Sequence, residues 1–152
     1  FRNVIFGVED SLVSTVGLLF GMAAAGIQNV TITTTGLILL SVEALSMGVG
    51  TYLSEESTNE VSDTKSRENP EIEGALMFVS YFLAGFIPLA PYFLLPQDVA
   101  KYVSVIATLI GLFLLGFLPS RRIKSGLRMM LIAGGAIILG YFIGRVLGVE
   151  SY

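Results

Sequence analysis

Three acidic side chains lie inside long apolar runs of this sequence: Glu9, Asp10 and Glu43. A charged group near the middle of a membrane span costs about 2.5–3.5 kcal/mol on insertion scales, so such a group usually lines a path or meets a partner. For Glu9 the preferred interpretation is hydrogen bonding between helices or a hydrated place near the membrane surface. For Asp10 and Glu43 the preferred interpretation is the lining of a path through the membrane.

Met47 lies four residues after Glu43, so the two side chains share one helix face. At a rise of 1.5 Å per residue, Asp10 and Met47 lie roughly 9 and 10 Å from the same side of the membrane. If the first two helices face each other, Asp10, Met47 and Glu43 form a ladder that ends near the middle of the bilayer. A methionine on an apolar helix is more often core filling, but this depth and spacing favour a metal ligand.

Two carboxylates and a thioether are a mixture of hard and soft ligands, which suits ferrous iron, manganese or cobalt. Magnesium and calcium prefer oxygen ligands alone. Zinc and copper usually take histidine or cysteine, and this chain has neither. We therefore expect ferrous iron or manganese as the cargo, with cobalt or zinc as weaker alternatives, and no permanently bound cofactor.

A second set of acids follows the second apolar run and could collect metal ions in the cytosol: Glu56, Glu60, Asp63 and Glu71. The first three fall at i, i+4 and i+7, so they share a face if the second helix continues beyond the membrane. The alternative is an ordinary solvated linker. The segment Asn69-Pro70-Glu71 is also typical of a helix start, with Asn69 as the cap.

The elements that must position these residues are membrane helices. The chain of 152 residues is 53% hydrophobic and 14% charged, whereas soluble domains are nearer a quarter charged. A membrane span needs about 20 apolar residues, and runs of that length in lipid favour helices over barrel strands. We therefore predict an all-α membrane protein, a single domain over residues 1–152, with spans at about 4–27, 32–54, 75–95, 99–118 and 127–148 and an acidic cytosolic segment at 55–74.

Lysine and arginine gather on one side of these spans. With the amino terminus in the cytosol, that side holds Arg2, Lys65, Arg67, Arg121, Arg122, Lys124 and Arg128, and the other side holds Lys101 and Arg145. Because basic residues favour the cytosolic side, we predict a cytosolic amino terminus and a carboxyl terminus on the opposite side. The basic cluster is thus a topology signal rather than a nucleic-acid site.

Two further patterns concern packing. Gly17 and Gly21 in the first span, and Gly140, Gly144 and Gly148 in the fifth, recur every four residues. Small residues at this spacing let helices approach closely in lipid, either within one subunit or between two, and we expect a homodimer. In the third span Pro88 and Pro91 predict a kink, which is either packed or the opening of a hydrated path.

The motifs Phe6-Gly7-Val8-Glu9-Asp10-Ser11-Leu12-Val13-Ser14-Thr15 and Ala44-Leu45-Ser46-Met47-Gly48-Val49-Gly50-Thr51-Tyr52-Leu53-Ser54 resemble the first two spans of the vacuolar iron transporter family, and Pro88–Tyr92 resembles its third. The resemblance covers nearly the whole chain. It implies five spans, a dimer and exchange of ferrous iron or manganese for protons, with the family's first-span aspartate at Asp10 and its second-span methionine at Met47. This chain has Glu9-Asp10-Ser11 where the family often has Asn-Asp-Gly, and Thr51 where many members have glutamate. Only about twenty residues stand where plant members have a long metal-binding insert.

The leading hypothesis is a proton-coupled transporter that moves ferrous iron or manganese out of the cytosol. The alternative is a membrane sensor or assembly subunit that transports nothing and whose buried acids are structural. An enzyme is not expected, because without histidine or cysteine no nucleophile and base can be paired from the sequence. The expected partners are lipid, divalent metal ions, protons and a second copy of the chain, in either a vacuolar or a cell membrane.

Overall fold

The computed structural model describes residues 1–62 and 68–149, and every element in that part of the chain is an α-helix. The helices are α1 (Arg2–Ala24), α2 (Asn29–Val61), α3 (Pro70–Leu94), α4 (Gln97–Ser120) and α5 (Ile123–Val149). All five are long and apolar enough to cross a membrane, which confirms the five predicted spans. The protein is therefore a multi-pass integral membrane protein.

The helix ends follow local signals in the sequence. The side chain of Asn69 accepts a hydrogen bond of 3.0 Å from the backbone N–H of Glu71, and Pro70 is the first residue of α3, as predicted. Pro96 separates α3 from α4, as the predicted span ends require. The tight turn from α4 to α5 places Arg121 in the left-handed region, with φ of 54°, and the backbone N–H of Arg122 bonds to the Ser120 hydroxyl.

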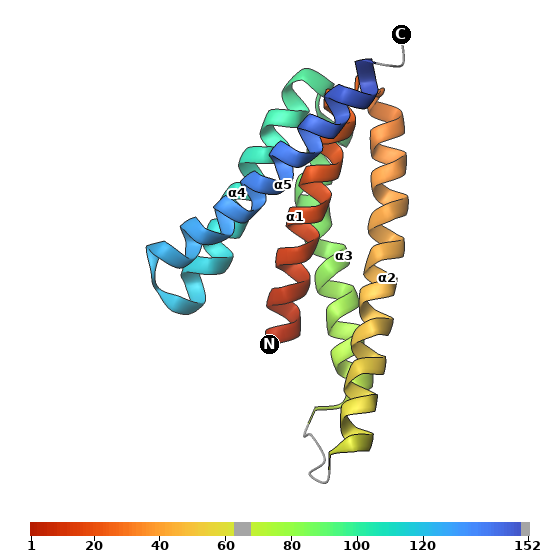
Figure 1. Ribbon diagram of the computed structural model, residues 1–152, viewed down its shortest axis with the longest axis vertical. Coiled ribbons are helices and arrows are strands. Elements are labelled where there is room, and N and C mark those ends of the chain that lie inside the picture. The colour runs from red at the N-terminus through yellow and green to blue at the C-terminus, as the bar shows by residue number, and fades with distance from the viewer. Residues whose placement is uncertain (63–67, 150–152) are drawn as a thin grey trace.

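Helix α1 packs against each of the other four helices. In Figure 1 it lies between α2 and the inclined pair of α4 and α5, with α3 behind it. We call the end of the bundle where α1 begins the Arg2 end, and the opposite end the Leu95 end. Toward the Arg2 end, the α4–α5 pair inclines away from the other helices, and α2 and α3 extend beyond the start of α1.

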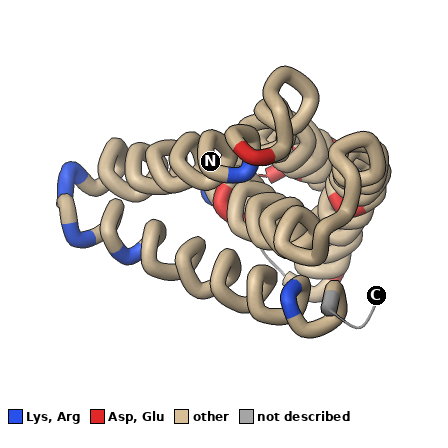
Figure 2. Tube along the Cα trace, turned by 90° about the horizontal axis from the view of Figure 1, so that it is seen from above, with Lys and Arg blue, Asp and Glu red and all other residues tan. Residues whose placement is uncertain are grey.

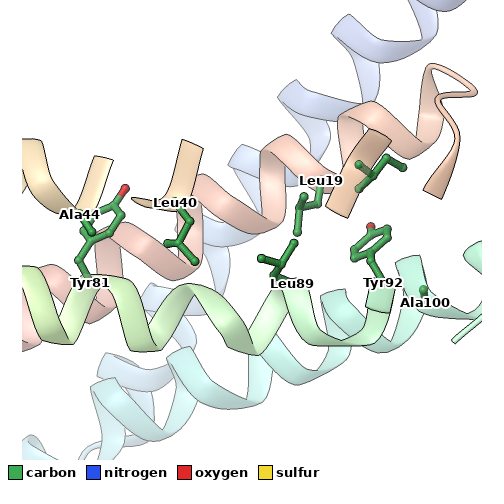
Figure 3. Close-up of a cluster of buried hydrophobic side chains, with 8 residues drawn as sticks. Leu19, Leu40, Ala44, Tyr81, Leu89, Tyr92 and Ala100 are labelled. Carbon is green, nitrogen blue, oxygen red and sulfur yellow. The ribbon is translucent and has the colours of Figure 1, made fainter. Parts of the chain in front are cut away.

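The core between α1, α2 and α3 contains Leu19, Leu40, Tyr81, Leu89 and Tyr92, all nearly inaccessible to solvent. Figure 3 shows the two tyrosines on α3, pointing to the same side of the helix toward α1 and α2. Pro88 and Pro91 lie inside α3, which continues through both to Leu94. The carbonyl of Pro88 accepts a hydrogen bond of 2.6 Å from the buried Ser104 hydroxyl, which ties α4 to α3.

The glycine pattern of the first and fifth spans is used within the chain. A Cβ atom added to Gly21 would lie 2.7 Å from the carbonyl oxygen of Gly140, and one added to Gly17 would lie 3.0 Å from that of Ala136. Helices α1 and α5 therefore meet backbone to backbone. Of the two possibilities that the glycine spacing allowed, the structure shows packing within one subunit. The glycines therefore give no support to a dimer.

Helix α2 runs further than its predicted span, since the apolar window ended at residue 54 and the helix ends at Val61. It is supported mainly by α1 and α3. Its crossing with α3 is also close, because a Cβ on Gly74 would lie 2.8 Å from the carbonyl oxygen of Gly48. The close crossing fixes the height of α2 against α3, and with it the height of the residues described next.

Candidate metal path

The face of α2 that turns toward α1 carries a regular row of side chains with donor atoms. Glu43, Met47, Thr51 and Glu55 follow one another at intervals of four residues, so each lies one turn beyond the last. All four are partly buried. The row supplies two carboxylates, a thioether and a hydroxyl along about three turns of helix.

A cavity of about 420 Å³ opens between α1, α2 and α3 at the Arg2 end. Met47, Thr51 and Glu55 line it from α2, and Asn3 and Phe6 line it from α1. The cavity thus reaches from the end of α1 to the level of Met47. It provides space through which an ion could reach the thioether.

Asp10 does not line this cavity, but it lies one helical turn beyond Phe6, which does. It lies four residues after Phe6 and four before Ser14, so the three side chains share one face of α1. Asp10 is half-buried, and it lies one turn before Ser14, whose hydroxyl is 3.0 Å from that of Tyr81. On α1, Asp10 therefore stands between the inner end of the cavity and the hydrogen-bonded group around Tyr81.

That group joins three helices near the middle of the bundle. The Tyr81 hydroxyl of α3 donates a hydrogen bond of 2.8 Å to Oε2 of Glu43, on α2. The Ser14 hydroxyl of α1 lies 3.0 Å from the Tyr81 hydroxyl. One turn before it, the Ser11 hydroxyl donates to the backbone carbonyl of Tyr81 over 2.6 Å. The predicted ladder residue Glu43 thus has a fixed partner that the sequence did not indicate.

Glu9 faces a different part of the molecule. It lines a cavity of about 330 Å³ between α1, α4 and α5, together with Arg128 and Ser120. Because residues adjacent in a helix point about 100° apart, Glu9 and Asp10 serve different surroundings although they are neighbours in the chain. Glu9 thus lines a different cavity from Met47, and its hydrogen bonding between helices or hydration near the membrane surface stays a prediction.

Among the described acids at the Arg2 end, Glu55 lines the larger cavity, whereas Glu71 lies with Tyr52 at a separate pocket between α2 and α3. Arg2 and Glu55 form an ion pair of 3.8 Å, and Asn3 donates a hydrogen bond of 2.7 Å to Glu73. Of the predicted collecting residues, Glu56, Glu60 and Glu71 are exposed, and Asp63 lies outside the described residues. Glu56 accepts a hydrogen bond from Tyr52, one turn before it on α2. Glu56 and Glu60 lie on the extension of α2, where they share a face as predicted.

The basic residues at the tip of the α4–α5 pair lie apart from the cavity between α1, α2 and α3. In Figure 2 one group of blue lysine and arginine positions lies at the tip of the α4–α5 pair, a further blue position lies beside the amino terminus, and red acidic positions lie over the other helices. The tip carries Arg121, Arg122 and Lys124, which are exposed. A cation approaching the cavity between α1, α2 and α3 therefore meets not the basic tip but the ion pair of Arg2 and Glu55, which both line the cavity.

The described residues contain no group of three or more acids that could hold a metal ion by themselves. Other donor atoms in this region are the Met47 thioether and Thr51 hydroxyl at the cavity and the hydroxyls of Ser14 and Tyr81 beyond it. A donor set of this kind binds an ion incompletely and lets it leave again, which a transport path requires.

Three residues of this path were not among the predicted site residues. Thr51 and Glu55 carry a signal that the sequence already contained, because they continue the four-residue spacing of Glu43 and Met47. Tyr81 carries no such signal. It lies 38 residues from Glu43, on another helix, and only the packing of α3 against α2 brings the two together.

A family model described as the VIT family matches residues 1–73 and 58–145 of the chain. Among curated proteins, Vacuolar iron transporter 1 of Arabidopsis thaliana is 24% identical over 95% of this chain and 85% of its own length. Vacuolar iron transporter 1 of Eucalyptus grandis is 25% identical over 99% and 86%, and Vacuolar iron transporter homolog 3 of Arabidopsis thaliana is 29% identical over 99% and 84%.

These alignments also bear on the connection between α2 and α3. The alignment with the first Arabidopsis protein extends over 212 positions, more than the 152 residues of this chain, so that relative has additional residues within the aligned region. The two parts of the family match meet at residues 58–73, which include the end of α2 and the start of α3. This is the place where the sequence predicted a shortened insert.

Proposed function

We propose a transport function for this chain, which belongs to the VIT family of membrane transporters. Family membership indicates that it carries a metal ion across a membrane. In our proposal the cargo is a divalent transition metal, ferrous iron or manganese, which leaves the cytosol in exchange for protons. The observation that carries the proposal is the cavity between α1, α2 and α3, which leads past Glu55 and Thr51 to Met47 and toward Asp10.

The choice of metal follows from the donor atoms. Carboxylate and hydroxyl oxygens are hard ligands and the Met47 thioether is soft, and this mixture suits ferrous iron, manganese and cobalt better than magnesium or calcium. The relatives reported above are named as iron transporters. Iron is therefore the first cargo to test, followed by manganese, cobalt and zinc.

Exchange for protons follows from the place of the acids. A carboxylate in an apolar surrounding must have its charge offset, and either a bound cation or a proton does so. Asp10 and Glu43 can therefore hold metal in one step and a proton in another. An exchanger needs groups that accept a proton when the metal ion leaves and a metal ion when the proton leaves.

The direct test is metal uptake by the purified protein in liposomes. We expect uptake of ferrous iron or manganese to increase when a pH gradient is imposed, and to be abolished by Asp10→Asn. A series of divalent ions assayed under identical conditions gives the order of preference. If the folded protein moved none of these ions with or without a gradient, transport would be excluded.

The same test decides about the alternative of a sensor or assembly subunit. One observation favours that alternative, namely that Glu43 is engaged by Tyr81 and so also serves to hold α2 against α3. A protein of this second kind would bind metal without moving it. It would therefore retain ions on its own surface but leave the interior of the liposomes empty.

The direction of transport, the orientation and the dimer also belong to the proposal. A cytosolic Arg2 end places the opening of the cavity where metal is collected, which agrees with export from the cytosol. The homodimer now depends on the family resemblance alone, because the glycines of α1 and α5 are used within the chain. Chemical cross-linking in detergent is its test, and monomer at every protein concentration would contradict it.

A further inference from the structure

We propose that Tyr81 is a positioning residue for transport, which holds the Glu43 carboxylate where an ion leaving Asp10 and Met47 arrives. This inference rests on the proposed transport function. It assigns to Tyr81 no contact with the ion. Its hydroxyl acts through Glu43, to which it donates a hydrogen bond of 2.8 Å.

Tyr81 is itself rigidly held. Its side chain is 2% exposed and packs in the core between α1, α2 and α3. Its backbone carbonyl accepts a bond from the buried Ser11 hydroxyl over 2.6 Å. Its own hydroxyl lies 3.0 Å from that of Ser14. Since a phenol has one proton and Tyr81 gives it to Glu43, Ser14 is the donor in this second bond. Tyr81 is thus tied to α1 through its backbone carbonyl and through its hydroxyl.

Glu43, in contrast, needs support from outside its own helix. A glutamate side chain has three rotatable bonds, and α2 is supported mainly by α1 and α3. The bond from Tyr81 uses Oε2 and leaves Oε1 for another partner. Because the Tyr81 hydroxyl also lies 3.0 Å from the Ser14 hydroxyl of α1, the carboxylate is held on the side of α2 that faces α1. Tyr81 therefore determines where the second carboxylate of the path stands.

The chain offers a matched control in Tyr92. It lies eleven residues after Tyr81, and Figure 3 shows both rings leaving the same side of α3. Both are buried in the same core, at 2% and 1% exposure. The Tyr92 hydroxyl, however, is buried without a hydrogen bond to an acid, and the polar side chain that it interacts with is Ser104 of α4. The two tyrosines match in helix, burial and ring size, and they differ in whether the hydroxyl reaches an acid.

The experiment compares Tyr81→Phe with Tyr92→Phe in the metal uptake assay. Both variants keep the ring and lose one oxygen atom. We expect Tyr81→Phe to lower kcat about tenfold, the effect of losing one hydrogen bond to a charged group. We expect KM to remain within about twofold, because loading at Asp10 and Met47 is untouched. Tyr92→Phe should leave both constants at the parent values.

Glu43→Asp removes the same contact from the other side, since it retains the charge but shortens the reach by one methylene group. It keeps the proposal testable if Tyr81→Phe does not fold. We expect it to match Tyr81→Phe within about threefold in kcat, and the double variant to be no slower than the slower single variant. A role of Tyr81 in stability alone would lower the amount of folded protein and leave kcat per folded molecule unchanged.

Three results would overturn the inference. The first is an equal kcat for Tyr81→Phe and Tyr92→Phe, and the second is a double variant whose loss in kcat is the product of the two single losses. The third is a Glu43→Asp variant that transports nothing while Tyr81→Phe still transports. Failure of the transport proposal looks different. In that case the parent protein moves no metal, or Asp10→Asn transports at the parent rate. A parent that transports and an inactive Asp10→Asn leave the result for Tyr81 to be judged by itself.

Discussion

Asp10 and Glu9 are adjacent acids with separate surroundings, which makes them a natural pair for testing the path. Asp10 follows the wall of the cavity between α1, α2 and α3, whereas Glu9 lines the cavity between α1, α4 and α5. At the scale of the single residue, the path predicts that only one of the two carries the ion.

We therefore expect Asp10→Asn to abolish metal uptake while the protein stays folded, because the amide can bind neither a cation by charge nor a proton in exchange. Glu9→Gln, the matched control, should transport within about twofold of the parent. Uptake of iron and manganese into liposomes measures both, with thermal unfolding as the check of folding. An Asp10→Asn variant that transports at the parent rate would show that the ion takes another route.

Met47→Leu nearly preserves volume and removes the sulfur atom, so it separates metal binding from packing. We expect a loss of affinity of roughly tenfold for ferrous iron, similar to the loss of one supporting interaction at a metal site. The preference for iron over magnesium should decrease at the same time, because the remaining donors are hard oxygens. Competition between the two ions in the uptake assay measures this, and an unchanged preference would make Met47 a packing residue.

At the scale of the element, the close contact between α1 and α5 holds α5 against the rest of the bundle. A Cβ on Gly140 would collide with the backbone of Gly17, whereas a Cβ on Gly135 of the same helix would meet nothing within 4 Å. We expect Gly140→Ala to lower the stability by about 1–3 kcal/mol. Gly135→Ala should be neutral or stabilise by up to about 1 kcal/mol, since alanine favours the helix. Thermal unfolding in detergent measures both, and equal effects would argue against the close contact.

The extension of α2 beyond the membrane leads to a prediction about salt. Glu56 and Glu60 are exposed, and charges in water are screened over about 8 Å at physiological ionic strength. Replacing both by glutamine should therefore raise the apparent KM modestly, and more at low salt than at high salt. Uptake measured over a range of metal concentrations at two ionic strengths provides the test. Complete loss of transport would instead make the two acids part of a defined binding site.

The helices themselves follow from the sequence, because the length of an apolar run in lipid leaves little choice of structure. The end of α2 does not, since the exposed turns from Glu55 to Val61 have no apolar periodicity to mark them. Contacts between helices are the part that sequence patterns convey least. The glycine spacing predicted a close helix contact but not which helices meet, and nothing in the chain connected Tyr81 with Glu43 before the packing of α3 against α2 was known.

At the scale of the whole molecule, the tip of the α4–α5 pair lies toward the same end of the bundle as the start of α1 and the extension of α2 (Figure 1). The bias of lysine and arginine predicts that this end faces the cytosol. In a chain without cysteine, Glu60→Cys is a single reporter on the extension of α2. We expect a membrane-impermeant thiol reagent to label it only from the cytosolic side. Labelling only from the opposite side would reverse the orientation and the direction of transport.

The length of α2 separates two properties of a transporter that a single affinity value combines: how often an ion arrives and how long it stays bound. Glu60 lies thirteen positions after Met47, which corresponds to about 20 Å of helix. That distance exceeds two screening lengths, so a charge at the tip hardly changes how long an ion stays beside the sulfur. The tip can change how often ions arrive. Its acids should therefore matter when metal is scarce and have no measurable effect at saturation, where the occupied path alone sets the turnover.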